Sequence, residues 1–291
     1  EVLVSHETYR HIRGVFQVEE VTPSSKPLSL RYAKASKVYS IKAVKPRVFR
    51  SETRGVEGVE TLMVGRDAEL TKMLSALEAA KEDRELHVVT VLGEAGLGKS
   101  RLLYEFYDRV DLLPDRFFVF KARALESMQG QPFSLLREIF LFRFDIQEKD
   151  SLAVAREKFV QGILEMTSDI TGRFGNGSDR EMKAHFIGQL IGLDFSGSRH
   201  LSGLVESEKQ VQDRAVLYAS QFFSSVSQKH PSVFYLDDLH WADDESLNFL
   251  DTISLECKKS PILICGFARL TLFERRPHWG EGRENWSRIR L

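Results

Sequence analysis

The chain has 291 residues, 42% of them hydrophobic and 29% charged, which favours a globular protein of about two domains. Its formal net charge of -1 provides no overall field that would favour a nucleic-acid or membrane partner. The two cysteines, Cys257 and Cys265, exclude a disulfide framework and a cysteine metal cluster. No apolar run approaches the ~20 residues needed to span a bilayer, so we expect a cytoplasmic protein with reduced thiols.

The first 41 or so residues carry segments in which apolar and polar residues alternate, a pattern typical of β-strands. The segments are EVLVS (1–5), GVFQVEEV (14–21) and KVYSIKAV (37–44). A short helix is predicted from Ser5, whose hydroxyl we expect to cap it. Because this region is too short for a stable domain of its own, we interpret residues 1–41 as the end of a larger α+β domain.

Residues 42–58, KAVKPRVFRSETRGVEG, are basic and show no clear periodicity. One proline and two glycines interrupt the segment, which predicts a solvated linker. Contact of its basic side chains with RNA or a membrane is the alternative. We expect the second domain to cover residues 59–291.

The second domain alternates strand and helix patterns. A helix is predicted from Gly65, with Asp67 as its cap, and another from Lys99 to Asp108. Apolar runs predict buried strands at 86–92, 116–124, 233–238 and 261–267. Helical periodicity fills residues 125–230. This order predicts an α/β fold with a parallel sheet and a helical insert.

A phosphate-binding loop is predicted directly after the first of these buried strands. Residues 93–100 match the pattern G-x-x-x-x-G-K-[ST] at every fixed position. The predicted binding loop therefore consists of Gly93, Glu94, Ala95, Gly96, Leu97, Gly98, Lys99 and Ser100. The glycines let backbone N–H groups approach phosphate oxygens, and the following helix begins with unpaired N–H groups. Lys99 adds a charge for the terminal phosphates, and the Ser100 hydroxyl can ligate Mg²⁺. Arg101 is included in the predicted binding set.

A pair of carboxylates follows the third buried strand, at Asp237 and Asp238. Strand ends of open α/β sheets face the ligand crevice, so we expect Asp237 to hold Mg²⁺, usually through water. Asp238 is then the candidate base or orienter of an attacking water. The alternative is a helix cap, a role that residues 243–245 are better placed to fill.

Three further side chains are candidates for contact with the nucleotide. Arg269, two residues after the fourth strand segment, could contact the γ-phosphate, and Arg66 could lie near the base. Both have the alternative of an exposed surface arginine. His240 is expected in a structural or relay role near the phosphates rather than as a metal ligand.

The segments MVGRDAEL (63–70), GEAGLGKSR (93–101), VFYLDDLHWADDES (233–246) and LICGFARLTLFERRPHWGEG (263–282) together resemble the STAND-type P-loop ATPase module of the AAA+ relatives. The sequence of these segments is similar to that of bacterial proteins in which a class III adenylate/guanylate cyclase domain precedes this module and a tetratricopeptide array follows it. The segment EVLVSHETYRHIRGVFQVEEV (1–21) resembles the last part of such a cyclase domain.

This resemblance implies an ATP- and Mg²⁺-dependent signalling switch, with protein partners engaged through C-terminal repeats. It also implies that the chain is a piece of a longer protein and lacks the cyclase catalytic residues. Residues 21–41 depart from the sequence usual in cyclases, which carries a lysine- and glycine-rich strand segment there. Leu270 stands where the family often has proline after the arginine, which bears on the placement of Arg269.

Two other functions remain open on the sequence. The module could bind a nucleotide without turnover, as an interaction scaffold, or it could be a small-molecule kinase whose helical insert holds the acceptor. No arginine-rich lid pattern supports the kinase. The chain has no copy of the asparagine-lysine-x-aspartate selector for guanine, which favours ATP together with the resemblance.

Overall fold

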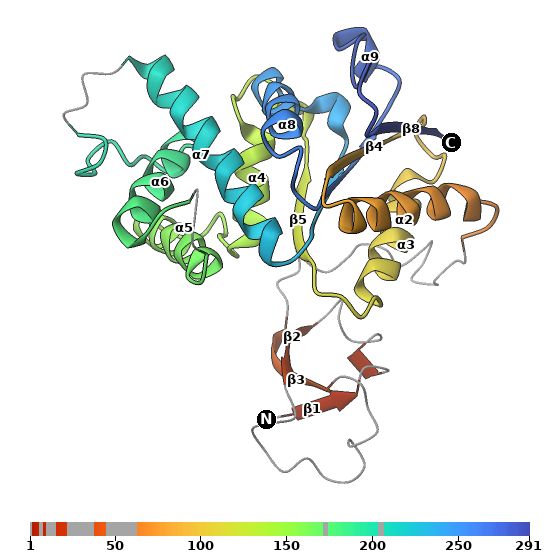
Figure 1. The fold of residues 1–291 in the computed structure, drawn as a ribbon, viewed down its shortest axis with the longest axis horizontal. Helices are drawn as coiled ribbons and strands as arrows, with labels where there is room; N and C mark the ends of the chain where they lie inside the picture. The colour runs from red at the N-terminus through yellow and green to blue at the C-terminus, as the bar shows by residue number, and fades with distance from the viewer. Residues whose placement is uncertain are drawn as a thin grey trace. The chain divides into compact units, whose positions relative to one another are not determined.

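The computed structural model describes residues 2–5, 8–9, 16–21, 38–44, 63–170, 174–202 and 207–291 (Figure 1). The chain divides into two compact units, Glu1–Leu62 and Met63–Leu291. Within the described part of the chain, no helix combines the length and apolar character needed to cross a membrane.

The first unit contains the three predicted strands, β1 (Val2–Ser5), β2 (Phe16–Val21) and β3 (Val38–Val44). They form an antiparallel sheet in the order β1-β3-β2. The Ser5 hydroxyl accepts a bond of 3.3 Å from the backbone N–H of Thr8, as a helix cap would. Because β3 continues to Val44, the predicted linker start at residue 42 is wrong, and residues 45–58 lie outside the described residues.

The second unit is built on a five-stranded sheet in the order β5-β6-β7-β4-β8, and every neighbouring pair is parallel. The strands are β4 (Leu86–Leu92), β5 (Phe118–Arg123), β6 (Ser232–Asp237), β7 (Ile262–Ala268) and β8 (Trp286–Arg290). The predicted α/β fold with a parallel sheet is therefore confirmed. Sequence patterning missed β8, an edge strand in which only Ile289 is buried.

Helices cover both faces of this sheet. They are α2 (Asp67–Glu82), α3 (Lys99–Asp111), α4 (Ser134–Arg143), α5 (Leu152–Thr167), α6 (Gly177–Leu190), α7 (Glu208–Lys229), α8 (Asp244–Glu256) and the short α9 (Leu272–Arg275). Alternate residues of β6 face opposite layers: Val233 and Tyr235 pack with α2 and α3, whereas Phe234 and Leu236 pack with the insert and α8. Burial on both faces explains why the strands are continuous apolar runs.

The helical insert comprises α4 to α7 and contributes aromatic side chains to the core. Phe223 of α7 contacts the rings of Phe120 in β5 and Phe234 in β6, with centroids 5.1 Å and 5.0 Å apart. Phe140 of α4 lies against Phe223 at 5.4 Å. The insert is thus part of the same core as the sheet.

The N-caps of α2 and α8 can be compared with the predicted caps. Arg66, not Asp67, is the N-cap of α2, and Asp67 is the first helical residue, so that cap prediction is wrong. The prediction for α8 is confirmed, because the Asp243 carboxylate accepts from the backbone N–H of Ser246 at 2.8 Å.

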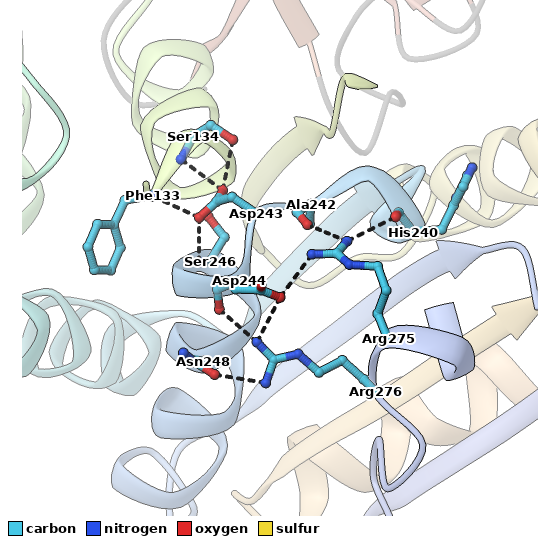
Figure 2. Close-up of polar contacts among 10 residues, drawn as sticks. All are labelled: Phe133, Ser134, His240, Ala242, Asp243, Asp244, Ser246, Asn248, Arg275 and Arg276. Atoms are coloured by element: carbon cyan, nitrogen blue, oxygen red, sulfur yellow. Dashed lines mark hydrogen bonds and ion pairs between the residues drawn. The ribbon is translucent and has the colours of Figure 1, made fainter. Parts of the chain in front are cut away.

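The same Asp243 carboxylate also fixes the start of α4, which lies 110 residues earlier in the chain. It accepts the backbone N–H groups of Phe133 (2.9 Å) and Ser134 (3.0 Å) and the Ser134 hydroxyl (2.8 Å), as Figure 2 shows. Asp243 is only 2% exposed. One buried carboxylate therefore caps two helices and ties the insert to the segment that follows β6.

We expect Asp243→Ala to lower the free energy of unfolding by about 2–4 kcal/mol, because it leaves buried N–H and O–H donors without an acceptor. Urea unfolding followed by circular dichroism measures the change. Asp169→Ala is the control, since that exposed aspartate makes an ion pair with Lys229 and should leave the midpoint nearly unchanged. Equal effects of the two substitutions would contradict the assignment.

Candidate functional site

The glycine-rich loop connects β4 to α3 and takes a backbone shape that favours glycine. Gly96 and Gly98 have φ angles of +85° and +89°, and Gly98 is the N-cap of α3. A Cβ atom added at either position would meet nothing within 4 Å, so the dihedral angles and not crowding call for glycine. The loop therefore leads directly into the helix end whose first N–H groups have no intrahelical partner.

Lys99 is the first residue of α3, and its side chain folds back over this loop. Its Nζ donates to the carbonyl oxygens of Gly93 at 2.7 Å and Glu94 at 2.9 Å. Lys99 is 8% exposed, whereas Ser100 beside it is exposed. A buried ammonium and a helix N-terminus thus lie next to each other, which together favour an anion.

Asp237 and Asp238 lie at the carboxyl end of β6. Burial and the charge of Asp238 raise the pKa of Asp237. The Asp238 backbone N–H, which donates to Asp237 Oδ1 at 3.0 Å, and the charges of Arg123 and Lys99 partly offset the rise. Because β4 and β6 both pair in parallel with β7, the loop after β4 and the acidic end of β6 lie at the same edge of the sheet. A half-buried carboxylate with a raised pKa beside a second one is suited to a cation.

No group of three or more histidine, cysteine, aspartate or glutamate side chains is gathered for a metal among the described residues. The available oxygen ligands, the Ser100 hydroxyl and the Asp237 carboxylate, suit Mg²⁺, which keeps several waters and takes few protein ligands. The residues present therefore fit Mg²⁺ carried with a nucleotide better than a metal held by protein side chains alone.

Asp238 has the left-handed φ of +53°, which is uncommon for a residue other than glycine. Its Oδ2 accepts from Nε of Arg123, the last residue of β5, at 3.0 Å. Arg123 is 63% exposed, so solvent screens this ion pair. Sequence reasoning missed Arg123, although its place at the end of the strand neighbouring β6 was the available signal.

His240 lies in the turn of residues 238–242, the acidic turn, and joins it to the segment that follows β7. It is 3% exposed, and its Nδ1 accepts from the backbone N–H of Arg269 at 3.4 Å. Burial lowers the pKa of His240, which favours the neutral ring, and an accepting Nδ1 assigns the ring proton to Nε2. That Nε2 and Nε of Arg269 are buried without a hydrogen-bond partner among the described residues.

The two other predicted arginines have different partners. Arg66 donates to Glu69 Oε1 at 2.9 Å and to the carbonyl oxygen of Leu97 at 3.4 Å. Arg101 forms an ion pair with Glu105, one turn further along α3. Arg66 thus contacts the loop itself, whereas the Arg101 guanidinium is directed along its own helix.

A protein-family model described as an AAA ATPase domain matches residues 62–264, about two thirds of the chain. The matched range contains the glycine-rich loop and both aspartates. A search of curated proteins finds no match to this chain.

We expect Arg123→Gln to change the free energy of unfolding by about 1 kcal/mol or less, because the Arg123 side chain of this ion pair is largely exposed to solvent. Urea unfolding in low salt measures the change, and Lys229→Gln, which removes another exposed ion pair, is the comparison. A loss several times larger would mean that Asp238 is locked by Arg123 and is not available to a ligand.

Proposed function

The chain belongs to the AAA ATPase domain family, and from this premise we propose that it binds Mg-ATP and hydrolyses it slowly, as a conformational switch in signalling. The observation that carries the proposal is the buried Lys99 ammonium, held in the loop at the same edge of the sheet as the Asp237–Asp238 strand end. The two features supply the positive and negative groups that a magnesium nucleotide requires.

Binding of the phosphates falls to the loop and the start of α3. The backbone N–H groups of residues 94–100 and the Lys99 ammonium are the donors for phosphate oxygens. Lys99 has two carbonyl partners in the loop, so its charge is held at the loop in advance of binding. Arg66, bonded to the Leu97 carbonyl, is proposed to border the nucleotide.

Mg²⁺ would be held by the Ser100 hydroxyl and, through water, by Asp237. When bound, the ion would neutralise part of the negative charge of the phosphates. The raised pKa of Asp237 supports this role, because a carboxylate that burial disfavours is stabilised by an adjacent cation.

Hydrolysis is proposed to depend on Asp238 and Arg269. The Asp238 carboxylate accepts a proton from the water that attacks the γ-phosphorus, and the bond to the leaving oxygen of ADP breaks. Arg269 stabilises the charge on the transferred group, and its Nε is buried without a partner among the described residues.

As a switch, the module would have an ATP-bound and an ADP-bound state. Moving the population from 1:99 to 99:1 requires ATP to favour one state by about 5.5 kcal/mol. Several charge-assisted bonds to the γ-phosphate supply free energy on that scale. Slow hydrolysis then resets the switch.

A nucleotide-binding module without turnover is the second candidate. The observation that favours it is the ion pair between Asp238 and Arg123, which occupies one oxygen of the proposed base. In that case, the bound nucleotide would act as a structural ligand at the loop.

The wider setting is also a proposal. Residues 1–21 resemble the end of a class III cyclase domain, and the antiparallel order β1-β3-β2 is compatible with an α+β remnant. We propose a cytoplasmic parent protein that engages protein partners through C-terminal repeats. The two cysteines, free and buried, support a reducing compartment.

Phosphate release from Mg-ATP over hours, at micromolar protein, tests turnover. We expect slow release by the wild type and none above background with Lys99→Ala or Asp238→Asn. Lys99→Ala should also abolish ATP binding, whereas Asp238→Asn should retain it, because Lys99 contacts the phosphates in the ground state and Asp238 does not.

Lys121→Ala is the matched control, since it removes a lysine of β5 that lies over the Tyr107 ring. Binding without release in the wild type would favour the structural-ligand alternative. Failure to bind any nucleotide would contradict both candidates.

A further inference from the structure

The segment between β7 and β8 carries two adjacent arginines, and both terminal nitrogens of each guanidinium group are hydrogen-bonded (Figure 2). Arg275 closes α9 and Arg276 follows it. Both guanidinium groups bind the region after β6 and share the Asp244 carboxylate, but only Arg275 also binds main-chain oxygens of residues 238–242. Neither residue has a role in the function proposed above.

Arg275 holds the main chain of the acidic turn. Its Nη1 donates to the carbonyl oxygens of His240 at 3.1 Å and Ala242 at 2.8 Å, and its Nη2 contacts Asp244 Oδ1 at 2.9 Å. The side chain is 28% exposed. Two bonds from one guanidinium nitrogen to main-chain oxygens fix a backbone position, which an ordinary surface ion pair does not do.

Arg276 holds the start of α8 instead. It donates to Asn248 Oδ1 at 2.9 Å and to the carbonyl oxygen and Oδ1 of Asp244, both at 3.1 Å. None of these acceptors belongs to residues 238–242. Arg276 is therefore similar to Arg275 in charge, burial and location, but it does not touch the turn.

The turn held by Arg275 begins at the proposed base. Asp238 has a left-handed backbone, and the turn is closed by bonds from Trp241 N–H to the Asp238 carbonyl (2.8 Å) and from Ala242 N–H to the Leu239 carbonyl (3.1 Å). A strained residue keeps its conformation only where its surroundings hold it. Asp243, directly after the turn, accepts hydrogen bonds from the start of α4, and Arg275 donates to carbonyl oxygens within the turn.

The segment that carries Arg275 also carries Arg269. The backbone N–H of Arg269 donates to His240 Nδ1, while Arg275 donates to the His240 carbonyl oxygen. The segment after β7 thus forms hydrogen bonds with both the ring and the main chain of His240. A shift of this segment would move the turn and Arg269 together.

We propose that Arg275 is a positioning residue for ATP hydrolysis: it fixes the Asp238–Ala242 turn through the His240 and Ala242 carbonyls and so sets the orientation of the Asp238 carboxylate toward the attacking water. The inference rests on the proposed function. Arg275 does not touch the nucleotide, so its contribution is to the rate of the chemical step and not to nucleotide affinity.

The test compares Arg275→Met with Arg276→Met in the 291-residue chain. Single-turnover hydrolysis gives the rate constant of the chemical step, and titration with a fluorescent ATP analogue gives the dissociation constant of the nucleotide. We expect Arg275→Met to slow the chemical step by roughly 10- to 100-fold, since small misplacements of reacting groups have effects of that size. Its dissociation constant should stay within about twofold of the wild type, and Arg276→Met should leave both quantities near wild type.

Hydrogen exchange provides a readout independent of activity. In the absence of nucleotide, Arg275→Met should accelerate exchange of the Trp241 and Ala242 amides, whereas Arg276→Met should not. Arg275→Lys should restore only part of the protection and rate, because an ammonium cannot reproduce the forked geometry of a guanidinium. Methionine and lysine are long side chains that keep the packing of the aliphatic part of arginine, so these variants should not unfold merely because packing is lost.

The outcomes separate the two proposals. A wild type that binds ATP but never hydrolyses it contradicts the hydrolytic function, and the exchange measurement then decides whether Arg275 fixes the turn. A wild type that hydrolyses ATP, with Arg275→Met and Arg276→Met indistinguishable in rate and exchange, overturns the positioning role. An equal loss of affinity and rate in Arg275→Met would also overturn it, because that pattern indicates a binding or folding defect.

Discussion

Parallel pairing of β7 between β4 and β6 is the constraint on which the site depends. Leu92 pairs with Ala268, and Leu236 pairs with Gly266, so the three strands end at the same edge of the sheet. The Gly93 N–H continues the pairing to the Ala268 carbonyl oxygen at 3.1 Å. Gly266 has no side chain, and a Cβ there would lie 2.4 Å from Leu239 Cδ1, so this glycine leaves room for the acidic turn on β7.

Two interactions with distant parts of the chain hold that turn in place. Asp243 ties it to α4 of the helical insert, and Arg275 ties it to the segment that follows β7. Both use charged groups against backbone partners, which gives them direction as well as strength. The acidic turn is therefore a meeting point of three segments, so that a change in the insert or beyond β7 has a physical route to Asp238.

The features that follow local rules could be predicted from the sequence. Apolar runs located β4 to β7, and the fixed positions of the glycine-rich loop identified Lys99 and Ser100, because one backbone shape requires those residue types in that order. Arg123, Arg275 and the second role of Asp243 were missed, since each depends on contacts between residues far apart in sequence. The edge strand β8 was missed because water reaches most of its residues, which leaves little hydrophobic pattern.

Equilibrium binding of Mg-ATP to the 291-residue chain tests most directly whether the loop and the acidic strand end form one nucleotide site. Isothermal titration calorimetry, with and without EDTA and for wild type and Lys99→Ala, is the measurement. We expect saturable binding at one site per chain, weaker without Mg²⁺ and absent in Lys99→Ala. Binding that is unaffected by both changes, or no binding of ATP or ADP at all, would contradict the assignment.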